Sequence, residues 1–368
     1  MATGHSDREK TRREKTRRAP RSLVTGACGF MGSHMVEVLH AAGHEVVATD
    51  LGGSLERDCR KRGCFPSVSR ELGVVPAPSD MRDAASLEPL THDLDYVFHV
   101  ASIFNYSTPW TTLHEVNVAG TRTLIELVLR NSPRLERFVV WGAGGVYGYP
   151  HYHEVPFHED LPPAPTNDYL RSKWFQEHLV MQYGQQGRLD YTILRPTTVY
   201  GPRAVYGSGP LLMGPAEMPI VVAPANFTFR IPFVHVRDVV GAALYLSTTD
   251  DARNQIYNLN DDSRLSNIDF FSFVAEVTNR RFQLLPSVPL ETLKPILRGV
   301  ATALAGMGRF IPDFTPPLEA DTVNYLGLDF LFDNKKLHEA GFDFRYPDPR
   351  PGLRETLEWY RDKGWISY

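Results

Sequence analysis

The chain has 368 residues, of which 42% are hydrophobic and 11% aromatic, which supports a buried core and excludes a disordered or collagen-like polymer. Its net charge of −4 is unevenly distributed: residues 1–21 carry eight basic and three acidic side chains, and the remainder carries 31 basic and 40 acidic ones, or −9. An acidic body argues against nucleic acid as a partner, because binding to phosphates needs a basic face.

The first 20 residues are expected to form a disordered basic tail. They contain the sequence REKTR twice, at 8–12 and 13–17, and no large apolar side chain follows Met1. Charge runs of this kind are usually solvated, which favours a dispensable extension over a tether to an anionic surface.

Cysteine content and hydropathy predict a cytoplasmic protein without an integral membrane span. Three cysteines are too few for a disulfide framework, which indicates a reducing compartment. No stretch of the sequence reaches the roughly 20 apolar residues that a spanning helix needs.

From Arg21 onward, short apolar segments alternate with amphipathic ones, which is typical of βαβ units and a parallel sheet. The expected class is α/β: a Rossmann-like, doubly wound parallel sheet with a smaller, interleaved C-terminal substrate lobe. Strands are expected at 22–25, 45–49, 74–77, 96–100, 138–142, 191–195 and 233–235, and helices at 31–42, 116–130, 169–183, 268–278 and 352–363.

The first strand leads into the sequence TGACGFMG at 25–32. Glycine at 26 and 29 lets the backbone turn tightly and approach a pyrophosphate at the N-terminus of the next helix, while Gly32 permits close packing of helix on strand. Asp50 ends the second strand 18 residues later, where its carboxylate can bind ribose hydroxyls and repel a 2′-phosphate. The pattern predicts a dinucleotide site that prefers NAD to NADP.

Further cofactor contacts are expected in the glycine loop and after the third and fourth strands. Asp80 is a candidate for binding the adenine amino group, against a simpler role as a helix cap. The remaining predicted contacts are Cys28, Phe30, Met31, Met81, Val100, Ala101 and Ser102.

Tyr169 and Lys173 are four residues apart and therefore lie on one face of a predicted helix. A tyrosine hydroxyl titrates near pH ~10, and a nearby cation stabilises the phenolate, which suits a general acid or base. The lysine could also hold the nicotinamide ribose and so fix the ring beside the reacting carbon. On their own, Tyr and Lys at this spacing are common surface residues.

The order of these motifs resembles that of extended short-chain dehydrogenases/reductases, in the NAD-dependent epimerase/dehydratase and 3β-hydroxysteroid dehydrogenase-like superfamily. The resemblance covers residues 21–365 and rests on the glycine loop, Asp80, the Tyr169–Lys173 pair, LRPTTVYGP at 194–202 and FVHVRDV at 233–239. It implies that Tyr169 is the catalytic acid/base and that Lys173 lowers its pKa and holds the ribose. It also implies that Pro196, Thr198 and Val199 line the nicotinamide.

One position departs from the family pattern. Ala143 stands three residues before Val-Tyr-Gly, where the family usually has Ser or Thr, so the hydroxyl that would bind the substrate oxygen is missing. Losing one oriented donor can cost on the order of 100-fold in rate. Thr197, Thr198 and Tyr147 are candidate substitutes, and Ala143, Tyr147 and Thr197 are the predicted substrate-side residues.

Residues 151–160 combine three histidines with three acids, but the run is interrupted by prolines and lacks a rigid helical spacing. We expect a substrate-side loop and no metal.

The expected division of the chain is an NAD-binding Rossmann domain (21–196 and 232–258) and a substrate-binding lobe (197–231 and 259–368). An apolar region at 284–314 fits a lid over a lipid-like substrate or ordinary core of the lobe. Nucleotide-sugar enzymes of the superfamily usually carry a basic residue just before the FVHV strand; Arg230 is close, although two residues intervene.

These features predict an NAD-dependent enzyme that interconverts a secondary alcohol and a ketone on a small-molecule substrate, with a hydroxysteroid-like or other apolar alcohol favoured. The first alternative is a nucleotide-sugar epimerase or dehydratase with tightly bound NAD. The second, motivated by Ala143, is a catalytically impaired dinucleotide-binding sensor. The resemblance also implies a homodimer through the helices at 116–130 and 169–183.

Overall fold

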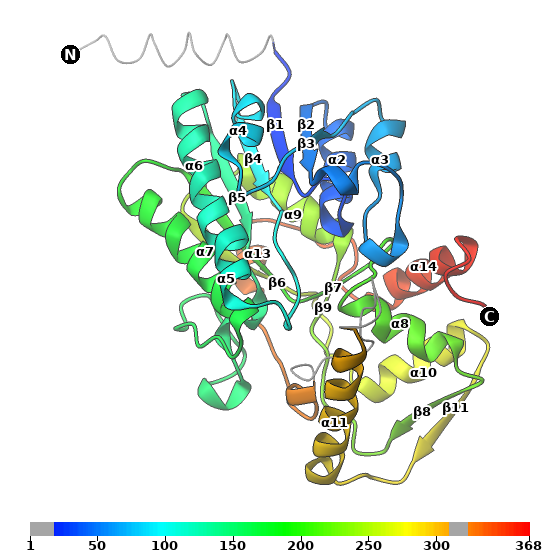
Figure 1. The fold of residues 1–368 in the computed structure, drawn as a ribbon. Coiled ribbons are helices and arrows are strands. Elements are labelled where there is room, and N and C mark those ends of the chain that lie inside the picture. The colour runs from blue at the N-terminus through cyan, green and yellow to red at the C-terminus, as the bar shows by residue number, and fades with distance from the viewer. Residues whose placement is uncertain (1–17, 309–322) are drawn as a thin grey trace.

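The computed structural model describes residues 18–308 and 323–368, which contain a parallel sheet of seven strands (Figure 1). The strand order β10-β6-β5-β4-β1-β2-β3 reverses the direction of sheet growth beside β1, as in a Rossmann fold. This confirms the predicted α/β class. The strands are β1 (Arg21–Thr25), β2 (Glu45–Asp50), β3 (Ala77–Pro78), β4 (Tyr96–His99), β5 (Arg137–Trp141), β6 (Tyr191–Pro196) and β10 (Gln255–Leu259).

Two of the strand predictions were wrong in part. Residues 233–235 form a strand, β9 (Phe233–His235), but β9 pairs with β7 (Thr198–Tyr200) outside the large sheet. The seventh strand of the large sheet is instead β10, which pairs in parallel with β6. β3 is shorter than the expected strand at 74–77, because only Ala77 and Pro78 pair with the end of β2. Strand membership depends on such partners, which local sequence does not contain.

Helices cover both faces of the sheet (Figure 1). Side chains alternate along each strand, so in β4 Phe98 joins the core under α2 and α9, whereas Val97 joins the core under α6 and α7. The helices of the first face are α2 (Phe30–Ala41), α3 (Pro66–Glu71) and α9 (Val236–Thr248). Those of the second face are α4 (Ala84–Leu87), α5 (Trp110–Leu113), α6 (Gly120–Asn131) and α7 (Asp168–Gln185).

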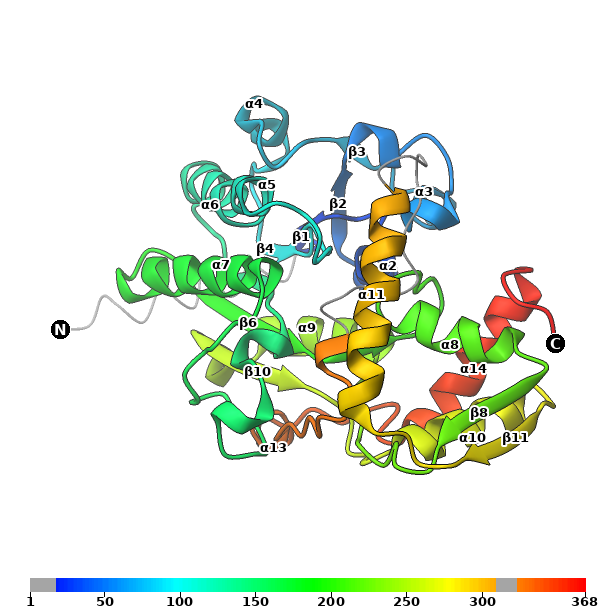
Figure 2. The same cartoon turned by 60° about the horizontal axis from the view of Figure 1, so that its bottom comes forward.

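The second lobe lies beyond the carboxyl ends of the strands, and Figure 2 shows it turned toward the viewer. Its own core contains Tyr200, Phe233 and Phe270. Leu337, from the C-terminal part of the chain, packs into the core of the large sheet instead, so the lobe and the sheet are interleaved. The further elements are α8 (Ser208–Glu217), β8 (Ile220–Pro224), α10 (Asn267–Val277), β11 (Arg281–Leu285), α11 (Leu290–Gly308), α13 (Lys335–Glu339) and α14 (Pro349–Asp362).

The predicted helices correspond to α2, α6, α7, α10 and α14 with shifted ends. The largest difference is at 116–130, where helical structure starts at Trp110. A π-helical turn at His114–Ala119 joins α5 to α6 there, and such turns are frequent at functional sites.

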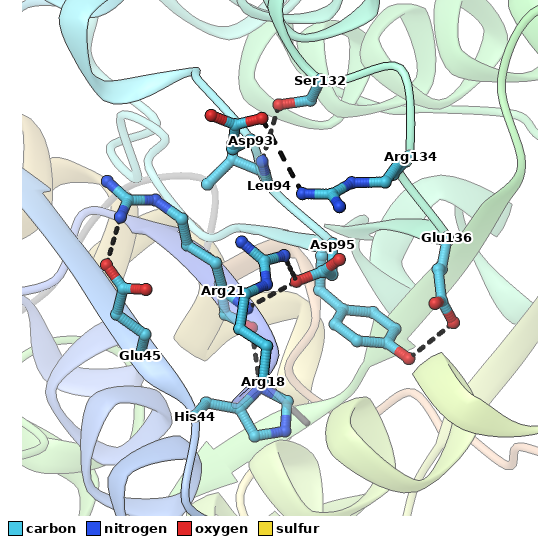
Figure 3. A network of polar contacts seen from close by, with 12 residues as sticks. Arg18, Arg21, His44, Glu45, Asp93, Leu94, Asp95, Ser132, Arg134 and Glu136 are labelled. Carbon is cyan, nitrogen blue, oxygen red and sulfur yellow. Dashed lines mark hydrogen bonds and ion pairs between the residues drawn. The ribbon is translucent and has the colours of Figure 1, made fainter. Parts of the chain in front are cut away.

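Polar contacts hold the amino-terminal edge of the sheet (Figure 3), which lies on the side away from the second lobe (Figure 1). Asp95 accepts hydrogen bonds from the Arg21 N–H at 2.7 Å and from the Arg18 guanidinium at 2.6 Å. The Pro20 carbonyl accepts a hydrogen bond from the Glu45 N–H at 2.9 Å. Residues 18–20 of the predicted tail therefore contact the sheet, and residues 1–17 lie outside the described residues.

Candidate active site

The glycine loop between β1 and α2 forms a cradle that excludes side chains. Gly26 has φ +66°, and a Cβ atom there would lie 3.0 Å from the backbone of Ala101. A Cβ on Gly32 would lie 1.9 Å from the Gly26 carbonyl oxygen. Gly29 is the residue before α2, so the N–H groups of Phe30 and the residues after it lie at the start of the helix. This arrangement suits the pyrophosphate of a dinucleotide.

Asp50 lies at the carboxyl end of β2, beside this loop. Its Oδ2 accepts the Cys28 N–H at 2.9 Å and its Oδ1 accepts the Leu51 N–H at 2.8 Å, which fixes the carboxylate. Burial raises the pKa of Asp50, and burial together with Asp50 raises the pKa of the Cys28 thiol to about 12. Cys28 is therefore a neutral, packed thiol, and the remaining lone pairs of Asp50 are available to ribose hydroxyls.

Two other predicted adenosine contacts follow β3. The Asp80 carboxylate pairs with Arg82 at 2.6 Å, and this hydrogen bond lowers the pKa of Asp80. An adenine amino group would share the carboxylate with that guanidinium. Met81 is buried and close to Gly120, where a Cβ atom would lie 2.7 Å from the Met81 Cβ.

The segment after β4 joins the glycine loop to the Tyr-Lys helix. Ala101 donates its N–H to Oγ1 of Thr25 at 3.1 Å, and Ser102 Oγ lies 3.4 Å from Nζ of Lys173. Val100, Ala101 and Ser102 thus lie between the two parts of the predicted site, on the carboxyl side of β4.

Lys173 is 2% exposed and is held by a buried polar network. Its Nζ donates to Oε1 of Gln176 at 2.5 Å, and the Gln176 amide donates to Oγ1 of Thr121 at 2.8 Å. His99 hydrogen-bonds the same Thr121 hydroxyl at 2.8 Å. Burial lowers the pKa of Lys173 to about 8 and that of His99 to about 3.

Gln176, Thr121 and His99 are not among the residues expected from the sequence. Gln176 could have been found, since it lies three residues after Lys173 on the same helix. Asn117, in the π-helical turn, is a further such residue: its amide donates to Ser172 Oγ at 3.0 Å and its Oδ1 accepts the Ile103 N–H at 2.8 Å. It therefore positions the Tyr-Lys helix against the segment after β4.

Tyr169 is 7% exposed and lies against two aromatic rings, Phe104 at 5.0 Å and Tyr106 at 5.7 Å between centroids. Burial raises its pKa, with a smaller contribution from Tyr325. Lys173, whose Nζ is directed toward Gln176, is not among the groups that shift this pKa. The spacing of Tyr169 and Lys173 places them on one helix, but the side chains around Tyr169 determine its pKa.

The loop after β5 is built around the buried carboxylate of Glu177. Ala143, 8% exposed, directs its N–H at Glu177 Oε1, 3.4 Å away. Arg195 donates to Glu177 Oε2 at 2.8 Å and to the Tyr147 hydroxyl at 2.8 Å. Tyr147 in turn donates to Oδ1 of Asn258 at 2.8 Å. The Tyr147 hydroxyl is therefore fully engaged inside the protein.

The residues that are expected to line the nicotinamide lie at and after the end of β6. Pro196 is the last residue of β6, and Thr198 and Val199 lie in β7. Thr198 donates its N–H to the Pro232 carbonyl at 2.9 Å. The Thr197 hydroxyl donates to the Leu259 carbonyl at 3.1 Å, so it serves the junction between β6 and β10.

The loop 151–160 packs against the sheet. Asn258 donates its N–H to Glu159 at 2.8 Å, and His153 hydrogen-bonds the Tyr147 carbonyl at 2.9 Å. Across residues 18–308 and 323–368, no group of three or more His, Cys, Asp or Glu side chains is placed to hold a metal ion. Within the same ranges, no helix is both long and apolar enough to cross a bilayer.

A Rossmann sheet, a glycine cradle with an acidic residue after β2, and a Tyr-Lys helix at the carboxyl edge define an NAD-dependent enzyme of the extended short-chain dehydrogenase/reductase type. The family model described as "NAD dependent epimerase/dehydratase family" matches residues 22–259. The chain belongs to this family.

Relatives and solved structures agree with that assignment. The chain is 25% identical to sterol demethylase protein B of Methylococcus capsulatus, over 94% of this chain and 99% of the relative. It is 24% identical to human dTDP-D-glucose 4,6-dehydratase, over 94% of this chain and 91% of the relative. The structure of Thermus thermophilus UDP-glucose 4-epimerase in complex with NAD superposes with a TM-score of 0.66 at 25% identity, covering 93% of this chain and 99% of that one.

Proposed function

We propose that the enzyme is a nucleotide-sugar epimerase or dehydratase that oxidises a secondary hydroxyl of its substrate as the first step. The observation that carries the chemistry is the buried Tyr169, one helical turn from Lys173, whose Nζ lies 3.4 Å from Ser102 in the segment that borders the glycine cradle. The dehydratase and epimerase among the relatives support a nucleotide sugar over the apolar alcohol that the sequence favours. Because these relatives are enzymes, they also argue against the sensor alternative.

In this mechanism NAD supplies the hydride acceptor. Tyr169 would take the proton of the substrate hydroxyl at its Oη in its deprotonated form, which its burial disfavours before cofactor and substrate bind, and would return the proton when the carbonyl is reduced again. Lys173, fixed by Gln176 and Ser102, would hold the ribose hydroxyls. Gly26, Gly29 and Asp50 would hold the pyrophosphate and the adenosine ribose. The rings of Phe104 and Tyr106 lie against Tyr169 and give the proton transfer apolar surroundings.

The test is a panel of UDP- and dTDP-hexoses incubated with the purified protein, with product analysis and a measurement of co-purified NAD. Tyr169→Phe should lower kcat by about 10²- to 10⁴-fold. The matched control is Tyr183→Phe on the same helix, whose hydroxyl donates to Glu126 and which should leave kcat unchanged. Turnover that survives Tyr169→Phe would disprove the assigned role.

A sterol or similar apolar alcohol is the second candidate. It is supported by the full-length similarity to sterol demethylase protein B and by exposed apolar side chains on α11, with Ile296 59% and Val300 47% exposed. A nucleotide sugar instead needs a cation for its diphosphate. Arg230, one-third exposed and 3.9 Å from Asp329, is the candidate, and Arg230→Met should raise KM for nucleotide sugars but not for sterols.

We also propose a cytoplasmic homodimer that forms through the outer faces of α5, α6 and α7. Trp110 lies 4.2 Å from the Arg171 guanidinium and 5.6 Å from the ring of Phe175, which is 40% exposed. Cys28, Cys59 and Cys64 form no disulfide bond, which suits a reducing compartment. Phe175→Glu should convert a dimer into a monomer in light scattering; an unchanged mass would place the interface elsewhere.

A further inference from the structure

A chain of buried hydrogen bonds runs from Lys173, on α7, to Thr25, the last residue of β1. The Lys173 Nζ lies 2.5 Å from Oε1 of Gln176, and the Gln176 amide nitrogen lies 2.8 Å from Oγ1 of Thr121. His99 completes the chain, with Nε2 at 2.8 Å from the Thr121 hydroxyl and Nδ1 at 2.8 Å from the Thr25 hydroxyl. The five side chains are each at most 2% exposed, so these bonds are shielded from solvent.

The direction of the first bonds follows from what each atom is able to donate. An ammonium group only donates, so the Gln176 atom that faces Lys173 is the carbonyl oxygen, and the amide NH2 group faces Thr121. The Thr121 hydroxyl gives its single proton to the Asn117 carbonyl at 2.7 Å, since a carbonyl only accepts. The Thr121 oxygen therefore accepts from both Gln176 and His99, which uses both of its lone pairs.

These directions determine which nitrogen of His99 carries the proton. Because the Thr121 proton goes to Asn117, His99 donates from Nε2, and the 3.2 Å approach of the Gln176 nitrogen to Nε2 is a contact between two donors. Burial, together with the charge on Lys173, lowers the pKa of His99 to about 3, which keeps the ring neutral. Nδ1 of His99 therefore carries no proton and accepts one.

The last bond of the chain reaches the backbone beside the glycine cradle. The Thr25 hydroxyl donates to Nδ1 of His99, and its oxygen accepts the Ala101 N–H at 3.1 Å. The opposite tautomer of His99 would need the Thr121 proton that Asn117 receives. One order of protons thus satisfies every bond from Lys173 to Ala101.

The two ends of the chain lie at the two parts of the cofactor site. Thr25 directly precedes Gly26 of the glycine cradle, and a Cβ atom on Gly26 would lie 3.0 Å from the backbone of Ala101. Lys173, which also approaches Ser102 at 3.4 Å, is the residue placed at the nicotinamide ribose in the proposed mechanism. The chain therefore spans from the pyrophosphate end of the site to its ribose end.

We propose that Gln176 and His99 are positioning residues that join Lys173 to the glycine cradle and hold the two parts of the cofactor site at a fixed separation before NAD binds. This inference goes beyond the proposed function and rests on it only for the place of Lys173 at the ribose. Both residues act through Lys173 and Thr25. Their effect is on cofactor affinity, because NAD does not have to order the Lys173 side chain as it binds.

The first experiment measures the Kd of NADH and of ADP by fluorescence titration and competition. Gln176→Met should raise the Kd of NADH by about 10- to 100-fold, the effect of losing a hydrogen bond to a charged group. It should leave the Kd of ADP nearly unchanged, because ADP lacks the nicotinamide ribose. The control is Gln182→Met on the same helix, an exposed side chain 3.2 Å from His178, which should change neither Kd.

A double-mutant cycle tests whether the chain acts as one unit. Thr25→Val removes the hydroxyl at the far end of the chain and should also weaken NADH binding. Combined with Gln176→Met, it should bind NADH about as weakly as the weaker of the two single variants, because residues of one hydrogen-bond network are not additive.

The nitrogen NMR spectrum of the imidazole rings tests the proton order in the wild-type protein, without any substitution in the chain. The signals of His99 are those that disappear in His99→Asn. They should show a protonated Nε2 and an unprotonated Nδ1 at neutral pH. The opposite tautomer would overturn the chain as described, whether or not Thr25→Val folds.

The binding outcomes separate this inference from the proposed function. A Kd of NADH that Gln176→Met leaves unchanged, an equal loss of NADH and ADP affinity, or single effects that multiply in the double variant overturns the positioning role and leaves the proposed function standing. If the cycle shows the coupling but no member of the nucleotide-sugar and sterol panel is turned over, the proposed function fails and the positioning role stands.

Discussion

Gly142 faces the carboxylate of Glu177 so closely that a Cβ atom at position 142 would lie 2.0 Å from Oε1. Glu177 cannot easily retreat, because its side chain is fully buried and paired with Arg195 at 2.8 Å. The glycine after β5 therefore makes room for a charge pair directly beneath the loop that contains Ala143.

Gly142→Ala should destabilise the fold by about 1–3 kcal/mol, because the added methyl group overpacks this contact. Urea unfolding of Gly142→Ala and of a control variant would measure the change in the free energy of unfolding. Gly299→Ala is the control: no atom lies within 4 Å of a Cβ placed there, and on α11 the change should stabilise by up to about 1 kcal/mol. Equal behaviour of the two variants would contradict the close approach of Glu177 to Gly142.

Glu177→Leu should cost about 3–5 kcal/mol in the free energy of unfolding, because it leaves the Arg195 guanidinium buried without its counter-charge. Replacing both residues with Leu should recover part of the loss. Glu276→Leu removes a carboxylate from an exposed pair with Arg354 and should cost less than about 1 kcal/mol. If Glu177→Leu lowers the free energy of unfolding no more than Glu276→Leu does, the buried pair between Glu177 and Arg195 does not stabilise the fold as proposed.

His99→Asn should make the free energy of unfolding less dependent on pH in the acid range. Burial lowers the pKa of His99 from an ordinary 6.5 to about 3, so between these values the unfolded chain binds a proton that the folded chain refuses. Stability therefore falls as the pH falls through this window, by at most about 1.4 kcal/mol per pH unit from this group, and is unaffected above it. Urea denaturation between pH 4 and 7 would measure this loss of stability in wild type, in His99→Asn and in His92→Asn, a control at an exposed site. The prediction is refuted if His99→Asn leaves the dependence of the unfolding free energy on pH unchanged.

We propose that the Asp50 carboxylate accepts hydrogen bonds from the ribose hydroxyls and repels a 2′-phosphate. Asp50→Asn should therefore weaken NADH binding by roughly 10- to 100-fold and reduce the preference for NADH over NADPH. Fluorescence titration with both cofactors gives the two Kd values. Asp58→Asn changes an exposed acid in the same stretch, one that accepts hydrogen bonds from Ser67, and should leave both values unchanged. A wild type that prefers NADPH would contradict the role of Asp50.

Much of the cofactor half of the site could be predicted from the chain alone. The glycine loop and Asp50 follow one another at fixed short spacings, and the backbone geometry of a strand, turn and helix leaves them little freedom. The surroundings of the predicted substrate-side residues could not, because the loop after β5 contacts Glu177, Asn258 and Tyr325, which come from three distant segments.

The sequence by itself determined the α/β class, the NAD loop and the placing of Tyr169 and Lys173 on one helix, because these follow from periodicity and from neighbours a few residues apart. Only the tertiary structure decided that β10 completes the sheet, that Tyr169 has a raised pKa, and that Tyr147 and Thr197 donate their protons elsewhere. Burial and hydrogen-bond partners decide such properties, and those partners come from residues as far apart as Thr166 and Tyr325, 159 positions away in the chain.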